Sequence, residues 1–146
     1  MALTPPISPA DKEGDRHAWA MLQRKQPQVD WNKSSLRRAD MTGEGKLARV
    51  MIGQDDEQQV WIGVARPDSR EGALNPHVVN VGRVELLSLS FQKLESTEDC
   101  LAAENTPLDG CRPRKGQRGL TITTGAAPPQ RLYWHAAEKR FVVWVP

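Results

Sequence analysis

Short strand-like segments separated by turn-forming residues dominate residues 46–145 of this chain. The segments are rich in β-branched and aromatic residues, whereas Gly, Pro, Asp and Asn gather between them, as in antiparallel sheets joined by tight connections. The clearest hairpins span residues 46–66 and 130–145. Residues 78–92 are the longest strand candidate, and residues 119–124 form another by composition. The sequence therefore predicts a mostly antiparallel sheet of about six to eight strands, folded as a sandwich or a small barrel.

One helix is expected before the strands. Residues 8–11 (Ser-Pro-Ala-Asp) are typical of a helix start, with a hydroxyl cap followed by proline and an acid. A modest apolar stripe follows, and Pro27 is incompatible with a continuing helix. We therefore expect a helix over about residues 10–25, packed against the sheet. A strand-like region begins at residues 29–31.

The length of 146 residues corresponds to one domain. We predict a flexible N-terminus at residues 1–9 and a single β-rich domain at residues 10–146, of the α+β class and mainly β. No stretch of about eighteen apolar residues is present, so the sequence predicts no transmembrane helix. Met1 and Ala2 run directly into a Pro-rich polar stretch, which we interpret as a start placed after a removed leader.

Tryptophan is over-represented, with five residues against two Phe and one Tyr. Trp61, Trp134 and Trp144 lie in strand-like segments with apolar neighbours, and we expect them to pack in the core. Trp19 lies beside the apolar stripe of the helix and is expected to pack onto the sheet. Trp31 follows an aspartate at a strand start, and this pattern assigns it to neither core nor surface.

The charge balance gives no support for a nucleic-acid partner. The net charge is only +2, whereas nucleic-acid-binding domains carry a strongly basic face. Basic residues cluster in one loop, residues 107–118, for which a merely solvated loop is the alternative interpretation. Together with residues 66–77, this loop is our candidate for binding a protein partner, because exposed loops commonly carry binding function. The candidate contact residues are Arg66, Arg70, Arg112, Arg114, Lys115 and Arg118.

The two cysteines, Cys100 and Cys111, enclose the short segment of residues 101–110. An even number of cysteines at short separation fits a disulfide that closes a surface loop. Two free thiols are an alternative, and a metal pair is disfavoured because no Cys-x-x-Cys or nearby histidine completes a ligand set. A disulfide implies an oxidising compartment, so we predict a periplasmic or extracellular location.

Residues 40–45 (Asp-Met-Thr-Gly-Glu-Gly) place an oxygen-bearing side chain at alternate positions, namely Asp40, Thr42 and Glu44. Calcium loops use this spacing because a hard cation needs six to eight oxygen ligands around one centre. Ala48 stands where a further acid is expected, and the cationic Arg49 beside it opposes calcium binding. A turn without metal is the alternative interpretation, because Asp and Gly both tolerate left-handed geometry.

This loop and the strand after it resemble the calcium loops of VCBS and FG-GAP-like repeats. Near the end of the chain, residues 132–135 (Leu-Tyr-Trp-His) and the aromatic strand after them are similar to the ends of a group of proteobacterial envelope proteins of uncharacterised function. The resemblance covers about residues 30–146. It implies a secreted or lipid-anchored β domain and implies no known reaction.

No catalytic motif is recognisable. His17, His77 and His135 lie in three different predicted elements, and no Gly-x-Ser-x-Gly elbow or phosphate-binding loop occurs. Paired acids such as residues 55–57 lie in polar turns, where ionised and solvated carboxylates are expected.

The leading hypothesis is therefore a non-enzymatic envelope module without a cofactor. It would bind a protein partner, as an inhibitor or immunity protein against a cell-wall hydrolase or a secreted toxin. One alternative is a calcium-stabilised structural or adhesive domain that uses residues 40–49. The other is a hydrolase whose site the sequence does not reveal.

Overall fold

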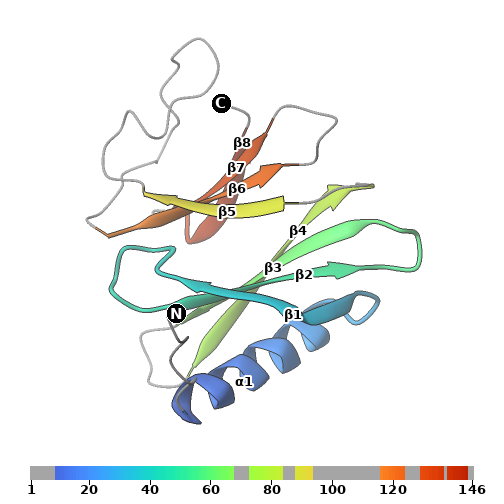
Figure 1. Cartoon of the computed structure of the whole chain (residues 1–146), viewed down its shortest axis with the longest axis horizontal. Coiled ribbons are helices and arrows are strands. Elements are labelled where there is room, and N and C mark those ends of the chain that lie inside the picture. The colour runs from blue at the N-terminus through green and yellow to red at the C-terminus, as the bar shows by residue number, and fades with distance from the viewer. Residues whose placement is uncertain are drawn as a thin grey trace, which may run out of the picture.

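The computed structural model describes residues 9–67, 73–83, 88–93, 116–123, 129–136 and 138–144. Within these ranges the chain forms one helix and eight strands (Figure 1). The elements are α1 (Pro9–Lys25), β1 (Asp30–Ala39), β2 (Ala48–Gln54), β3 (Val60–Pro67), β4 (Leu74–Gly82), β5 (Ser88–Lys93), β6 (Arg118–Thr123), β7 (Gln130–His135) and β8 (Arg140–Trp144).

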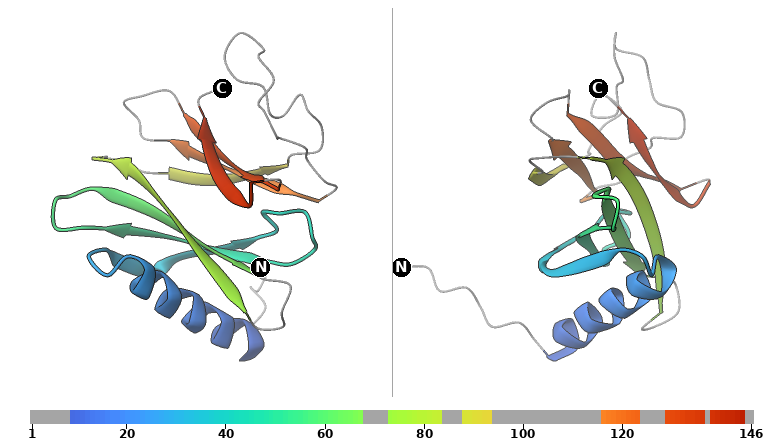
Figure 2. Two further views of the ribbon diagram at one scale, coloured as in Figure 1. Left: turned by 180° about the vertical axis from the view of Figure 1, so that it is seen from behind. Right: turned by 90° about the vertical axis from the view of Figure 1, so that its right-hand side faces the viewer.

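The strands form two four-stranded sheets, ordered β1-β2-β3-β4 and β5-β6-β7-β8, in which all neighbours are antiparallel. Helix α1 covers one face of the first sheet, and the second sheet lies beyond the opposite face (Figures 1 and 2). The prediction of an N-terminal helix packed on antiparallel strands is confirmed. In the described part of the chain, no helix is long and apolar enough to cross a membrane.

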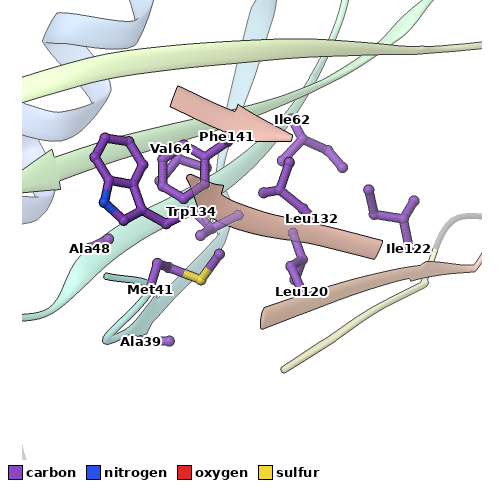
Figure 3. Packing of buried hydrophobic residues seen from close by; sticks show 11 residues of the cluster. Ala39, Met41, Ala48, Ile62, Val64, Leu120, Ile122, Leu132, Trp134 and Phe141 are labelled. Carbon is purple, nitrogen blue, oxygen red and sulfur yellow. The ribbon is translucent and has the colours of Figure 1, made fainter. Parts of the chain in front are cut away.

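A core between the two sheets holds them together (Figure 3). Alternate side chains of each strand point toward it, as the pleat of a β-strand requires. Because α1 covers its other face, the central strands β2 and β3 of the first sheet are largely buried on both sides, and β3 is apolar from Val60 to Ala65 without alternation. The buried members of this core are Ala39, Met41, Ala48, Val50, Ile62, Val64, Leu120, Ile122, Leu132, Trp134 and Phe141.

A second core lies between α1 and the first sheet, and Trp31 is at its centre. The Trp31 side chain is only 2% exposed, and its Nε1–H donates to the backbone oxygen of Leu22 at 3.1 Å. Its ring passes over two glycines of neighbouring strands, since a Cβ at Gly53 would lie 2.8 Å from the ring and one at Gly63 would lie 2.9 Å from it. The glycines therefore leave the space that the indole occupies together with the side chains of Val29 at Gly53 and of Leu22 at Gly63.

An ionic contact also joins α1 to the sheet. The carboxylate of Asp15 pairs with Arg38 of β1 and with Arg49 of β2, whose Nε lies 3.0 Å from Oδ1. The Arg49 guanidinium crosses α1 at Gly14, where any Cβ would collide with it. A glycine in the middle of a helix destabilises it by about 0.5–1 kcal/mol relative to alanine. Here it makes room for an ion pair between the helix and the sheet.

The prediction of one long strand at residues 78–92 is wrong. The chain leaves the first sheet at Gly82, and β5 belongs to the second sheet. Gly82 has a φ of +82°, a left-handed geometry that ends an extended strand, and its N–H donates to Asn80 Oδ1 at 2.7 Å. The structure also begins β4 at Leu74, inside the predicted loop of residues 66–77.

We predict that Gly53→Ala lowers the free energy of unfolding by about 1–3 kcal/mol, because the added methyl group overpacks the space held by Val29, whose Cγ1 would collide with the new Cβ, and by Trp31. The backbone oxygen of Asp30 would lie 3.0 Å from the new Cβ, so the strand itself would have to move. Urea denaturation followed by far-UV circular dichroism measures the loss. Gln54→Ala, at the exposed next position, is the control and should change stability by less than about 0.5 kcal/mol. Equal stabilities of the two variants would contradict the packing described.

Candidate functional site

Residues 40–47, Arg66 and Arg118 lie at one end of the two sheets, which we call the loop end. The register places Ala39 of β1 opposite Ala48 of β2, and Pro67 of β3 opposite Leu74 of β4, at this end of the first sheet. The second sheet joins it through β6, because the Arg118 N–H donates to the backbone oxygen of Asp40 at 2.7 Å. Figure 1 shows the teal connection between β1 and β2 at this end.

The loop of residues 40–45 is held by its own backbone. Asp40 Oδ1 accepts the Gly43 N–H at 2.8 Å, and Oδ2 accepts the Gly45 N–H at 2.9 Å. Both glycines have left-handed φ values, +78° and +80°, which glycine adopts at no steric cost. Met41 anchors the loop in the core between the sheets. The loop is therefore a preformed turn organised by one carboxylate.

The three predicted calcium ligands are not equivalent in the structure. The two oxygens of Asp40 accept hydrogen bonds from the turn, Thr42 is 5% exposed, and Glu44 is exposed. Among the described residues, no group of three or more acidic, histidine or cysteine side chains could hold a metal ion. The expectation that this loop holds no cofactor, and the alternative that it binds calcium, both stay predictions.

Arg66, a predicted partner contact, is half-buried in a cluster that joins the two sheets. Its guanidinium lies 4.5 Å from the ring centre of Trp134, and its Nε donates to His77 Nε2 at 3.3 Å. The His77 ring meets Trp134 and Phe141 edge to face, with centroids 5.6 and 5.1 Å away. Burial, and then the nearby charge of Arg66, lower the pKa of His77 from 6.5 to about 4. His77 is therefore neutral at pH 7.

Of the other sequence-predicted contact residues, the structure places Arg118, whose side chain is half-buried at the start of β6. The predicted disulfide and the rest of the basic cluster stay predictions, because they lie outside the described residues. The residues concerned are Arg70, Cys100, Cys111, Arg112, Arg114 and Lys115.

The acidic turn at residues 55–57 has a structural explanation. Asp55 Oδ2 accepts the indole N–H of Trp61 at 3.0 Å, and Oδ1 accepts the N–H groups of Glu57 and Gln59 at 2.9 Å each. The hydrogen bond from Trp61 is the main cause that lowers the pKa of Asp55. This carboxylate therefore organises the β2–β3 hairpin, as expected for an ionised side chain in a turn.

A groove between α1 and β1 was not predicted from the sequence. It consists of two hollows, of about 670 Å³ and 360 Å³, and Trp19 and Lys33 line both of them. Lys33 Nζ lies 4.1 Å from the centre of the Trp19 ring, and Trp19 Nε1–H donates to the backbone oxygen of Trp31 at 3.2 Å. We call these two hollows the Trp19 groove. A tryptophan in an amphipathic helix suits packing onto a sheet and lining a binding surface equally well. The sequence therefore contains no pattern that indicates a groove.

Comparison of the chain with protein-family models, with curated proteins and with solved structures gave no match.

We predict that Asp40→Ala lowers the free energy of unfolding by about 1–2 kcal/mol, because two N–H groups of the turn lose a charged acceptor. Urea denaturation in the presence of a chelator measures this loss. Glu44→Ala, an exposed acid of the same loop, is the matched control and should leave stability unchanged. A gain in stability from millimolar calcium that both variants abolish would instead favour the metal-bound loop.

We also predict that His77 makes the fold less stable below neutral pH. Its pKa is lower in the folded chain than in the unfolded chain, so the unfolded chain binds more protons between about pH 6.5 and pH 4. As the pH is lowered through this window, the free energy of unfolding should fall by about 1–2 kcal/mol after allowance for solvent screening. Below the window the contribution of His77 should stay constant. Denaturation midpoints at pH 7 and pH 4.5 test this, since His77→Gln should lose that share of the pH dependence. An identical pH profile in the variant would contradict it.

Proposed function

We propose that this chain is a non-enzymatic module that binds a protein partner through the loop end. The observation that carries the proposal is the hydrogen bond from the Arg118 N–H to the Asp40 oxygen, which joins the loop of residues 40–45 in the first sheet to the start of β6 in the second sheet. The Asp40 carboxylate also accepts two hydrogen bonds from the backbone of its own turn. A preformed surface loses little conformational entropy on binding, which suits tight recognition.

The chemistry of the charged groups supports the absence of catalysis in the described part of the chain. There, the pKa is clearly displaced for Asp55, His77 and Glu138. Asp55 holds a hairpin, His77 packs between the sheets, and the carboxylate of Glu138 pairs with Arg140, which lowers its pKa. A hydrogen-bonding partner therefore lowers the pKa of Asp55 and of Glu138, whereas burial between the sheets is the main cause for His77.

The partner class that we propose is a cell-wall hydrolase of the bacterial envelope, with the chain acting as its inhibitor or immunity protein. Arg118 contributes a cation to the loop end, and the sequence adds Arg112, Arg114 and Lys115 just before it. Glycoside hydrolases carry two carboxylates in the cleft that cleaves the sugar chain. Guanidinium groups form the strongest hydrogen bonds with carboxylates, so a basic loop is chemically suited to such a cleft. The envelope location rests on the predicted disulfide and on the family resemblance.

We predict that the full chain inhibits a lysozyme-type glycosidase or an envelope amidase in a peptidoglycan clearing assay. Reversing the charges of Arg112, Arg114, Lys115 and Arg118 to Glu should weaken inhibition by more than about tenfold, because charge-assisted hydrogen bonds to the carboxylates of the cleft are replaced by repulsion. Arg83→Glu, an exposed cation at the opposite end of the first sheet, tests for a general charge effect and should preserve inhibition. No inhibition of either enzyme class would refute this partner class. Inhibition that the fourfold reversal leaves intact would refute the loop end as the contact surface.

A further inference from the structure

The Trp19 groove lies along the exposed edge of the first sheet, where β1 departs from regular pairing. The register of β1 and β2 is interrupted between Asn32 and Arg37. Inside this bulge, Ser35 Oγ accepts the backbone N–H of Ile52 at 2.9 Å, so a side chain takes the place of a strand-to-strand hydrogen bond. Bulges of this kind prevent another strand from adding to an edge. A ligand in the groove would therefore be recognised through side chains.

The smaller hollow of the groove has an excess of positive charge. Lys12 and Arg16, one helical turn apart on α1, line it together with Lys33 of β1. Across the described residues, none of these three cations forms an ion pair with a carboxylate. The single carboxylate that lines this hollow belongs to Asp15, and two arginines of the sheet already hold it. This hollow is thus suited to a ligand that brings negative charge.

The larger hollow has a different character. Asn32, Ser34 and Gln54 contribute uncharged hydrogen-bonding groups, and Asp30 contributes a negative charge. Amide and hydroxyl groups suit a peptide backbone, whereas the Asp30 carboxylate would repel a chain of phosphates. Binding of single-stranded nucleic acid also needs successive aromatic platforms. In this hollow Trp31 is 2% exposed, so Trp19 provides the aromatic surface.

We propose that the Trp19 groove binds an acidic peptide segment of a protein partner. Carboxylates of the peptide contact Lys12 and Arg16 in the smaller hollow, an apolar side chain packs on Trp19, and the peptide backbone continues past Asn32 and Gln54. The volumes of the two hollows are of the size that ligand sites have, about 300–1,000 Å³. This surface is separate from the loop end, so the proposal does not depend on the proposed function.

The test is a display selection of random twelve-residue peptides against the immobilised full chain, followed by fluorescence anisotropy of the enriched peptides. The expected result is enrichment of peptides that combine Asp or Glu with an aromatic or aliphatic residue, with binding that weakens as salt is raised. Lys12→Glu with Arg16→Glu should weaken binding by about tenfold or more, because two favourable charge contacts become repulsive.

The matched control is Arg24→Glu with Lys25→Glu, which makes the same charge change at exposed positions in the last turn of the same helix. It should retain binding, and thermal melting establishes that both double variants are folded. Enrichment of peptides without acidic residues, or equal weakening of binding in the two double variants, would overturn the proposal. Tighter binding of a labelled oligothymidine, abolished in Lys12→Glu with Arg16→Glu, would overturn it in favour of nucleic acid.

Discussion

The contact of Trp31 with Gly53 and Gly63 sets how closely the helix and the first sheet can pack. The first sheet packs against another layer on both faces, so neither face of its central strands is exposed to solvent. On the helix side, one flat indole fills the space above two strands, and its N–H satisfies the Leu22 carbonyl of α1. Because α1 is held this close, Asp15 can reach the arginines of the sheet.

This arrangement also determines where the two candidate surfaces lie. The helix and the bulged edge of β1 form the walls of the Trp19 groove, and Trp19 is fixed there because its indole N–H donates to the Trp31 backbone. At the loop end, Met41 is buried between the sheets while its neighbour Asp40 binds both its own turn and the backbone of β6. Each surface is therefore held by residues of the adjoining core.

Local patterns predicted α1 and the β2–β3 and β7–β8 hairpins well, because caps, turns and alternation act over a few residues. The break between β4 and β5 could not be predicted in this way. Gly82 interrupts an apolar run there, but only the packing of two separate sheets shows that the chain passes from one sheet to the other. Trp31 could not be assigned, since its burial depends on glycines far away in the sequence. The Trp19 groove could not be predicted either, because it forms only where α1 and the β1 bulge lie side by side in the fold. The basic residues of the loop end were recognisable from sequence, but the link from Arg118 to Asp40 was not.

The proposed contact between a protein partner and the loop end can be tested by amide hydrogen exchange of the full chain, measured with and without a hydrolase that it is found to inhibit. We expect slower exchange on binding at residues 40–47 and 116–118, because a bound partner covers the backbone there. Little change is expected in the hairpin turn at residues 55–59, at the opposite end of the first sheet. Slower exchange at residues 55–59, with none at residues 40–47, would contradict binding through the loop end.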